Sequence, residues 1–160
     1  MAEGLSIAVA LNDGKSDAKT TAYGLTYSGS TGTVGFKLAA AAANSDNGTA
    51  DTDKTHYGLQ ITAGAITLGV AQNGQDKSDD TKDYSSTEMG IKYAVSDVLT
   101  IAAMNRSAET GTATEDYEMT AYGATYTIAP GLTTSVTSSD VDVSSTNKDS
   151  RIVIALEASF

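Results

Sequence analysis

Apolar residues alternate with small or polar ones along most of the chain, which is typical of β-strands. The last segment shows this most clearly, because Ile152, Ile154, Leu156 and Phe160 share one parity. The same period of two recurs in ten segments, near residues 5–11, 20–28, 33–43, 55–63, 66–71, 89–95, 99–103, 117–129, 132–138 and 151–160. The pattern predicts one domain, residues 1–160, made of ten strands.

The connections between these segments alternate between long and short. The long ones are polar and mostly acidic, and they cover residues 12–19, 44–54, 72–83, 107–116 and 139–150. The short ones carry turn residues such as Gly64 or Pro130-Gly131. We therefore expect an all-β fold: a closed antiparallel up-and-down transmembrane β-barrel of about ten strands, with short periplasmic turns and longer acidic external loops.

The two faces of the predicted strands differ in a way that suits a membrane barrel. One face carries Leu, Ile, Val, Met, Tyr and Phe with almost no charge, whereas the other carries mainly Gly, Ala, Ser and Thr. A water-soluble sheet would bury the large residues and place Lys and Glu outside. We expect the large residues to face lipid and the small ones to surround water. A secreted soluble β-protein, such as an adhesin module, is the less favoured alternative.

Aromatic residues of the apolar face gather near the predicted strand ends, as in the girdles at the two membrane interfaces. The predicted interface residues are Tyr23, Tyr27, Phe36, Tyr57, Tyr93, Tyr122, Tyr126 and Phe160. Tyr84 and Tyr117 do not fit the parity of that face, so they are expected to be loop residues or to mark bulges.

Composition narrows the possible functions. The net charge of −10 provides no basic footprint for nucleic acid, and the longest apolar run, residues 38–43, is far too short for a membrane helix. No secretion leader is visible at Met1, so we expect a mature or engineered form of the chain. The expected location is the bacterial outer membrane, where the partners are the lipid bilayer, or detergent, and small ions and solutes.

Several stretches resemble bacterial porins, most of all the general porins of purple non-sulfur α-proteobacteria. They are residues 5–10 before Asn12-Asp13-Gly14-Lys15, Tyr57-Gly58-Leu59, residues 122–126 and the final Phe160. The resemblance implies a water-filled channel, usually a trimer of 16-stranded barrels. This chain is too short for sixteen strands and has no loop long enough for that family's eyelet. A monomer, and an engineered or truncated porin, are therefore alternatives.

Polar residues of the small-residue face are the candidates for lining a pore. They are Lys37, Gln60, Glu88, Lys92, Arg106, Arg151 and Glu157. We expect passive diffusion of ions and small hydrophilic solutes, with a weak cation preference because acidic loops concentrate cations at the mouth. The alternative is a non-conducting barrel that acts as a scaffold or binds a partner through its loops.

Catalysis, metal binding and cofactors are not expected. His56 follows Asp51 and Asp53, but one histidine beside an acidic loop arises often without a hydrolytic function. Asp46-Asn47-Gly48 lacks the spacing and the terminal glutamate of a calcium-binding loop. We assign no catalytic residue, no metal ligand and no cofactor.

Overall fold

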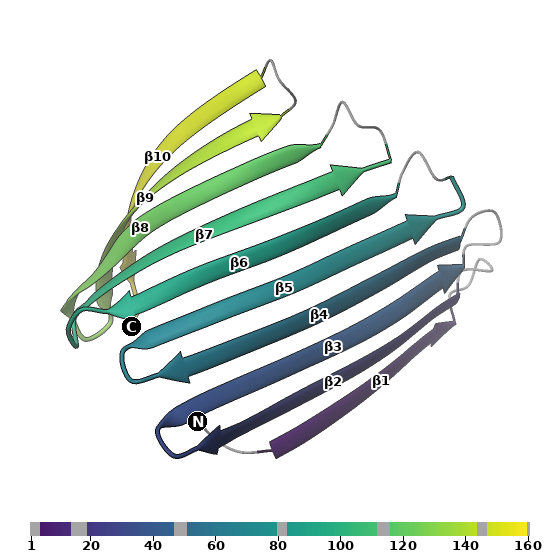
Figure 1. Ribbon diagram of the computed structural model, residues 1–160, viewed down its shortest axis with the longest axis horizontal. Coiled ribbons are helices and arrows are strands. Elements are labelled where there is room, and N and C mark those ends of the chain that lie inside the picture. The colour runs from purple at the N-terminus through teal and green to yellow at the C-terminus, as the bar shows by residue number, and fades with distance from the viewer. Residues whose placement is uncertain are drawn as a thin grey trace.

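The computed structural model describes residues 4–13, 19–46, 51–79, 83–111, 116–143 and 147–159. These residues form a single sheet of ten strands, shown in Figure 1. The strands are β1 (Gly4–Asp13), β2 (Lys19–Thr31), β3 (Val34–Asp46), β4 (Asp51–Ala63), β5 (Ile66–Lys77), β6 (Tyr84–Ala94), β7 (Leu99–Thr110), β8 (Tyr117–Ala129), β9 (Leu132–Val143) and β10 (Asn147–Ala158). The predicted number of strands is confirmed.

Each strand pairs antiparallel with the next one in the chain, in the order β1 to β10. Figure 1 shows the sheet curving, with the short turns, the start of β1 and the end of β10 on the same side. Within the described residues, β1 and β10 are each paired on one side only, so the predicted closure of the barrel remains a prediction. No helix in the described part of the chain is long and apolar enough to span a membrane.

Tight turns fix the register at the short-turn end. Gly32, Gly64 and Gly131 have φ values of 58°, 56° and 79°, in the left-handed region that glycine adopts without a steric penalty. Pro130 precedes Gly131, and proline is preorganised for the first central position of such a turn. The register shift that the structure gives lies between Thr127 and Ala129, beside this turn. Bulges at Tyr84 or Tyr117 are not found, because the pairing of both residues is regular.

The predicted bounds of the long loops are wrong, because the strands extend into the polar segments. β5 continues to Lys77 and β7 to Thr110, and β4 starts at Asp51. At the end of the sheet opposite the short turns, the connections contain three to six residues. Backbone pairing does not depend on side-chain polarity, so a strand continues into water wherever its neighbour continues with it. A strand of 13 residues is longer than the roughly 9–11 residues that a tilted strand needs to cross a bilayer.

Most of the large apolar residues of the described strands share one face and are exposed, and the contact of this face with lipid stays a prediction. Leu59, Ile91, Ile154 and Leu156 are 36%, 46%, 77% and 70% exposed, and they do not form a dry centre. We call their side of the sheet the apolar face and the opposite side the small-residue face. Among the described residues, the buried side chains are Ser86, Ala108 and Ala121, and all three lie on the small-residue face.

The register places seven of the eight predicted interface aromatics on the apolar face, and Phe160 lies outside the described residues. Tyr27 and Phe36 contact each other across β2 and β3, with ring centroids 5.7 Å apart. The Phe36 ring also covers the backbone of Gly29, which is buried. Contact with the two membrane interfaces remains a prediction for these aromatics.

Candidate functional site

All seven predicted pore-lining residues lie on the small-residue face. The register aligns Lys37 with Gln60, Glu88 with Arg106, and Lys92 with Thr67 on neighbouring strands. Arg151 and Glu157 share this face on the edge strand β10. The structure therefore brings five of the seven together on β3 to β7 and places the other two at one edge of the sheet.

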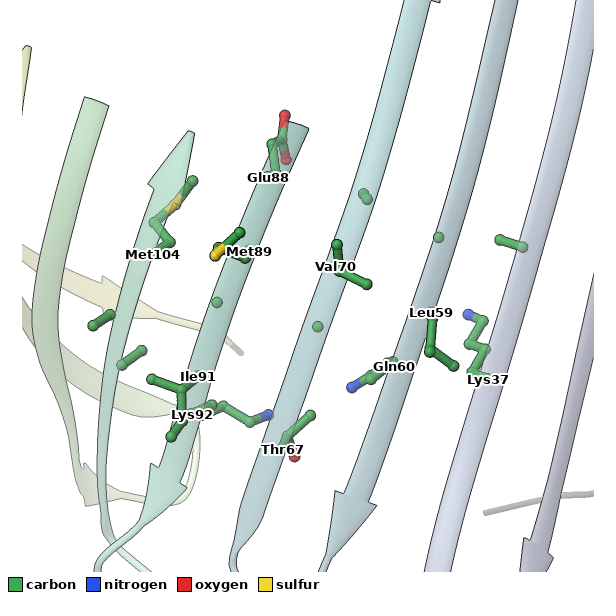
Figure 2. Close-up of a pocket in the computed structure, with 17 residues that line it drawn as sticks. Lys37, Leu59, Gln60, Thr67, Val70, Glu88, Met89, Ile91, Lys92 and Met104 are labelled. Carbon is green, nitrogen blue, oxygen red and sulfur yellow. The ribbon is translucent and has the colours of Figure 1, made fainter. Parts of the chain in front are cut away.

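A hollow of about 540 Å³ lies over β3 to β7, and Lys37, Gln60, Glu88 and Lys92 are part of its lining. Figure 2 shows Lys92 reaching over β5 toward Thr67, while Gln60 points toward the same space from β4. Much of the remaining lining is glycine and alanine, so few other side chains fill the space. The lining also includes apolar-face residues such as Leu59 and Ile91, since the sheet is a single layer.

An aromatic and charged cluster lies beside this hollow, on β6, β7 and β8. Arg106 donates a hydrogen bond from Nη2 to the Tyr84 hydroxyl, and its Nε lies 3.4 Å from Glu88 Oε1. The Arg106 guanidinium lies 6.0 Å from the centroid of the Tyr84 ring and 5.7 Å from that of Tyr117. Both distances are within the range of cation–π attraction. The two tyrosine hydroxyls are 3.5 Å apart and so meet above the intervening strand β7.

The cluster continues across the sheet as a chain of polar side chains. Ser86 hydrogen-bonds to Tyr84, and the Asn73 amide donates to Ser86 Oγ at 3.3 Å. Asn73 Oδ1 in turn lies 2.7 Å from His56 Nδ1. These contacts connect β4, β5 and β6 on the small-residue face. We call the connected set, from His56 through Asn73, Ser86 and Tyr84 to Arg106, Glu88 and Tyr117, the polar network.

The surroundings of His56 do not resemble a hydrolytic site. Its described partner is the Asn73 amide, and Asp51 and Asp53 belong to the opposite, apolar face of β4. Asp46 also lies on the apolar face, and Asn47 and Gly48 fall outside the described residues. Within the part of the chain that the structure describes, no group of three or more potential ligands could hold a metal ion.

Sequence reasoning missed the tyrosines of the polar network. Tyr84 has the same parity along β6 as Glu88, and Tyr117 pairs directly with Ala108 on β7. Both residues are therefore ordinary strand positions on the small-residue face. Their parity, which differs from that of the apolar face, was the sequence signal that both tyrosines lie on the small-residue face. For Tyr84, a loop or a bulge follows from a predicted strand that begins near residue 89, whereas β6 begins at Tyr84.

The polar network predicts different effects for its two tyrosines. The Tyr84 hydroxyl has Arg106, Ser86 and Tyr117 as partners, whereas the hydroxyl of Tyr117 has Tyr84. Tyr84→Phe should lower the free energy of unfolding by about 1 kcal/mol, and Tyr117→Phe should change it by much less. Urea titration of the refolded variants in lipid vesicles measures the difference. Equal losses for the two variants would contradict the hydrogen-bond assignment.

Family and fold comparisons agree with one another. A family model described as "Gram-negative porin" matches residues 2–146 of the chain. No curated protein matches it in sequence.

Solved structures with a similar fold include several outer-membrane proteins. Pseudomonas aeruginosa OpdK with vanillate superposes with a TM-score of 0.79 at 10% identity, covering 96% of this chain and 52% of that one. Acinetobacter baumannii OccAB4 gives 0.76 at 12% identity, covering 96% and 49%. The KdgM porin in complex with disordered oligogalacturonate gives 0.59 at 12% identity, covering 100% and 86%. The chain thus spans about half the length of the first two, and at these identities the likeness shows the fold alone.

Proposed function

Because the chain belongs to the Gram-negative porin family, we propose that it forms the wall of an outer-membrane channel for passive diffusion of ions and small hydrophilic solutes. One observation carries the proposal: the sheet exposes its large apolar residues on one face and collects small and polar residues on the other. A sheet of this kind is stable when the apolar face contacts lipid and the other face contacts water. The hollow over β3 to β7 supports a wet interior, because short side chains leave room for solvent.

A conducting wall has to close, and the edge strands are suited to closure. β1 and β10 run antiparallel, since successive strands alternate in direction. Both continue the apolar face, with Leu5 and Ile7 on β1 and Ile154 and Leu156 on β10. Direct pairing of these two strands gives the ten-stranded barrel predicted from the sequence. A relation to the general porins of α-proteobacteria is part of this proposal. It leaves open whether the channel is a monomer or a trimer.

Charge placement changes the basis of the predicted selectivity. The weak cation preference was expected from acidic residues in loops around the channel mouth. Many of those carboxylates are instead strand residues of the apolar face, such as Asp53 on β4 and Asp76 on β5. They face away from the proposed lumen, so the sign of the preference depends on the charges of the small-residue face.

Single-channel recording tests the proposed function. Refolded protein added to a planar bilayer in KCl should produce steady conductance steps, and a heat-unfolded sample should produce none. Folding is checked beforehand by comparing the gel mobility of unheated and boiled samples. A correctly folded sample that stays silent would contradict the channel and favour the non-conducting scaffold.

A further inference from the structure

Charged side chains are sorted between the two faces of the sheet. Among described strand residues, the small-residue face holds six basic groups, namely Lys37, Lys54, Lys77, Lys92, Arg106 and Arg151. It holds three acidic ones, Glu88, Asp149 and Glu157. The apolar face holds eight acidic groups, namely Asp46, Asp51, Asp53, Asp76, Glu109, Glu118, Asp140 and Asp142. The chain has a strong net negative charge, but basic groups outnumber acidic ones among the described strand residues of the small-residue face.

Pairing leaves two lysines of the hollow unbalanced. Glu88 is the acidic residue in the lining, and its nearest basic group is Arg106 at 3.4 Å. The other two acidic residues of this face lie on the edge strand β10, with Arg151 between them in sequence. Within the described part of the chain, no ion pair joins Lys37 or Lys92 to a carboxylate. The hollow thus keeps an excess of positive charge at these two positions.

The surroundings of Lys37 and Lys92 make their charges effective. Their neighbours in the hollow include Gly58, Gly69 and Gly90, which have no side chain. The two lysine side chains are therefore among the longest in the hollow (Figure 2). Lys37 and Lys92 are both exposed on the small-residue face, so in a water-filled channel their charges can act directly on passing ions. The carboxylates of the apolar face lie on the other side of the sheet. Salt at about 0.1 M largely screens interactions between exposed charges that are more than roughly 10 Å apart.

We propose that Lys37 and Lys92 make this channel prefer anions, so that its solutes are inorganic anions and small carboxylates rather than cations. The inference rests on the proposed channel function and gives that channel a substrate class. It reverses the cation preference expected from the sequence, because many of the carboxylates behind that expectation lie on the opposite face.

Reversal potentials in a KCl gradient test the preference. The unaltered protein should pass chloride roughly threefold to tenfold better than potassium, as expected for two unbalanced charges on a narrow aqueous wall. The double variant Lys37→Glu/Lys92→Glu should reverse the sign. The neutral double variant Lys37→Gln/Lys92→Gln should remove most of the preference. It replaces the glutamate variant in this test if the glutamates impair folding.

A matched pair on the apolar face provides the control. Asp53 and Asp76 are directly opposite each other on β4 and β5. The variant Asp53→Asn/Asp76→Asn should leave the reversal potential unchanged, because neither residue faces the lumen. A shift toward anions in this control, a potassium preference of the unaltered protein, or an unchanged potential in both lysine variants would each overturn the inference while conduction stands. Absence of conductance in folded protein would overturn the channel itself, and the inference with it.

Discussion

Replacing Leu68 by arginine should lower the free energy of unfolding in a bilayer by about 2–4 kcal/mol, the cost of a basic side chain on the lipid face near mid-membrane. Leu68 lies on β5 and is 50% exposed, so other residues of the protein cover only half of its surface. Its partners on the neighbouring strands are Ile61 and Ile91, both on the apolar face. An arginine here has no anionic partner and must displace hydrocarbon.

The adjacent residue provides the control for this substitution. Thr67→Arg alters the same strand one residue away, but on the small-residue face, where Thr67 lines the hollow. This variant should lose much less stability than Leu68→Arg, because the new side chain enters water, although it lies opposite Lys92 and loses the Thr62 hydrogen bond. Urea titration in lipid vesicles, followed by circular dichroism, measures both. Equal destabilisation of the two variants would contradict the assignment of the faces.

Replacing Gly123 by alanine should cost about 1–3 kcal/mol, the usual price of overpacking a tightly packed position. A Cβ atom at Gly123 would lie 2.5 Å from the Val136 carbonyl oxygen and 3.2 Å from the Thr137 Cα. Both are backbone atoms of β9, and they cannot move away without disturbing the pairing of β8 with β9. The expected observation is a lower midpoint of urea unfolding.

Gly69→Ala is the matched control for this steric effect. Gly69 also lies within a strand on the small-residue face, but a Cβ atom there would be 3.9 Å from its nearest neighbour, the Leu59 carbonyl oxygen. Because alanine loses less conformational entropy on folding than glycine, Gly69→Ala should be neutral or slightly stabilising. Loss of stability in the control alone would show that the close contact at Gly123 does not determine the outcome.

The number of strands and the sorting of residues between faces could be predicted from the sequence because both depend on a period of two. Ile152, Ile154 and Leu156 alternate so regularly that one strand defines two faces. Short turns were also predictable, since Gly64 and Pro130-Gly131 have conformations that few other residues adopt. These features are local and require no knowledge of the neighbouring strand.

Strand ends could not be predicted because they depend on pairing. The segment from Gln72 to Lys77 is polar and resembles a loop by composition, yet its backbone pairs with β4 and β6. The same dependence hid part of the candidate site. His56, Asn73 and Ser86 are far apart in sequence and form a network because the register places them in one row across three strands.

The near absence of buried side chains has a consequence for how this protein is kept stable. In the described residues, Ser86, Ala108 and Ala121 provide almost no nonpolar interior. The hydrophobic contribution to stability must then come from the acyl chains around the sheet, which take the place that a core has in a water-soluble domain. Shorter or sparser acyl chains should weaken the fold even though every contact within the polypeptide is unchanged. The surrounding amphiphile is, in this sense, a structural component of the molecule.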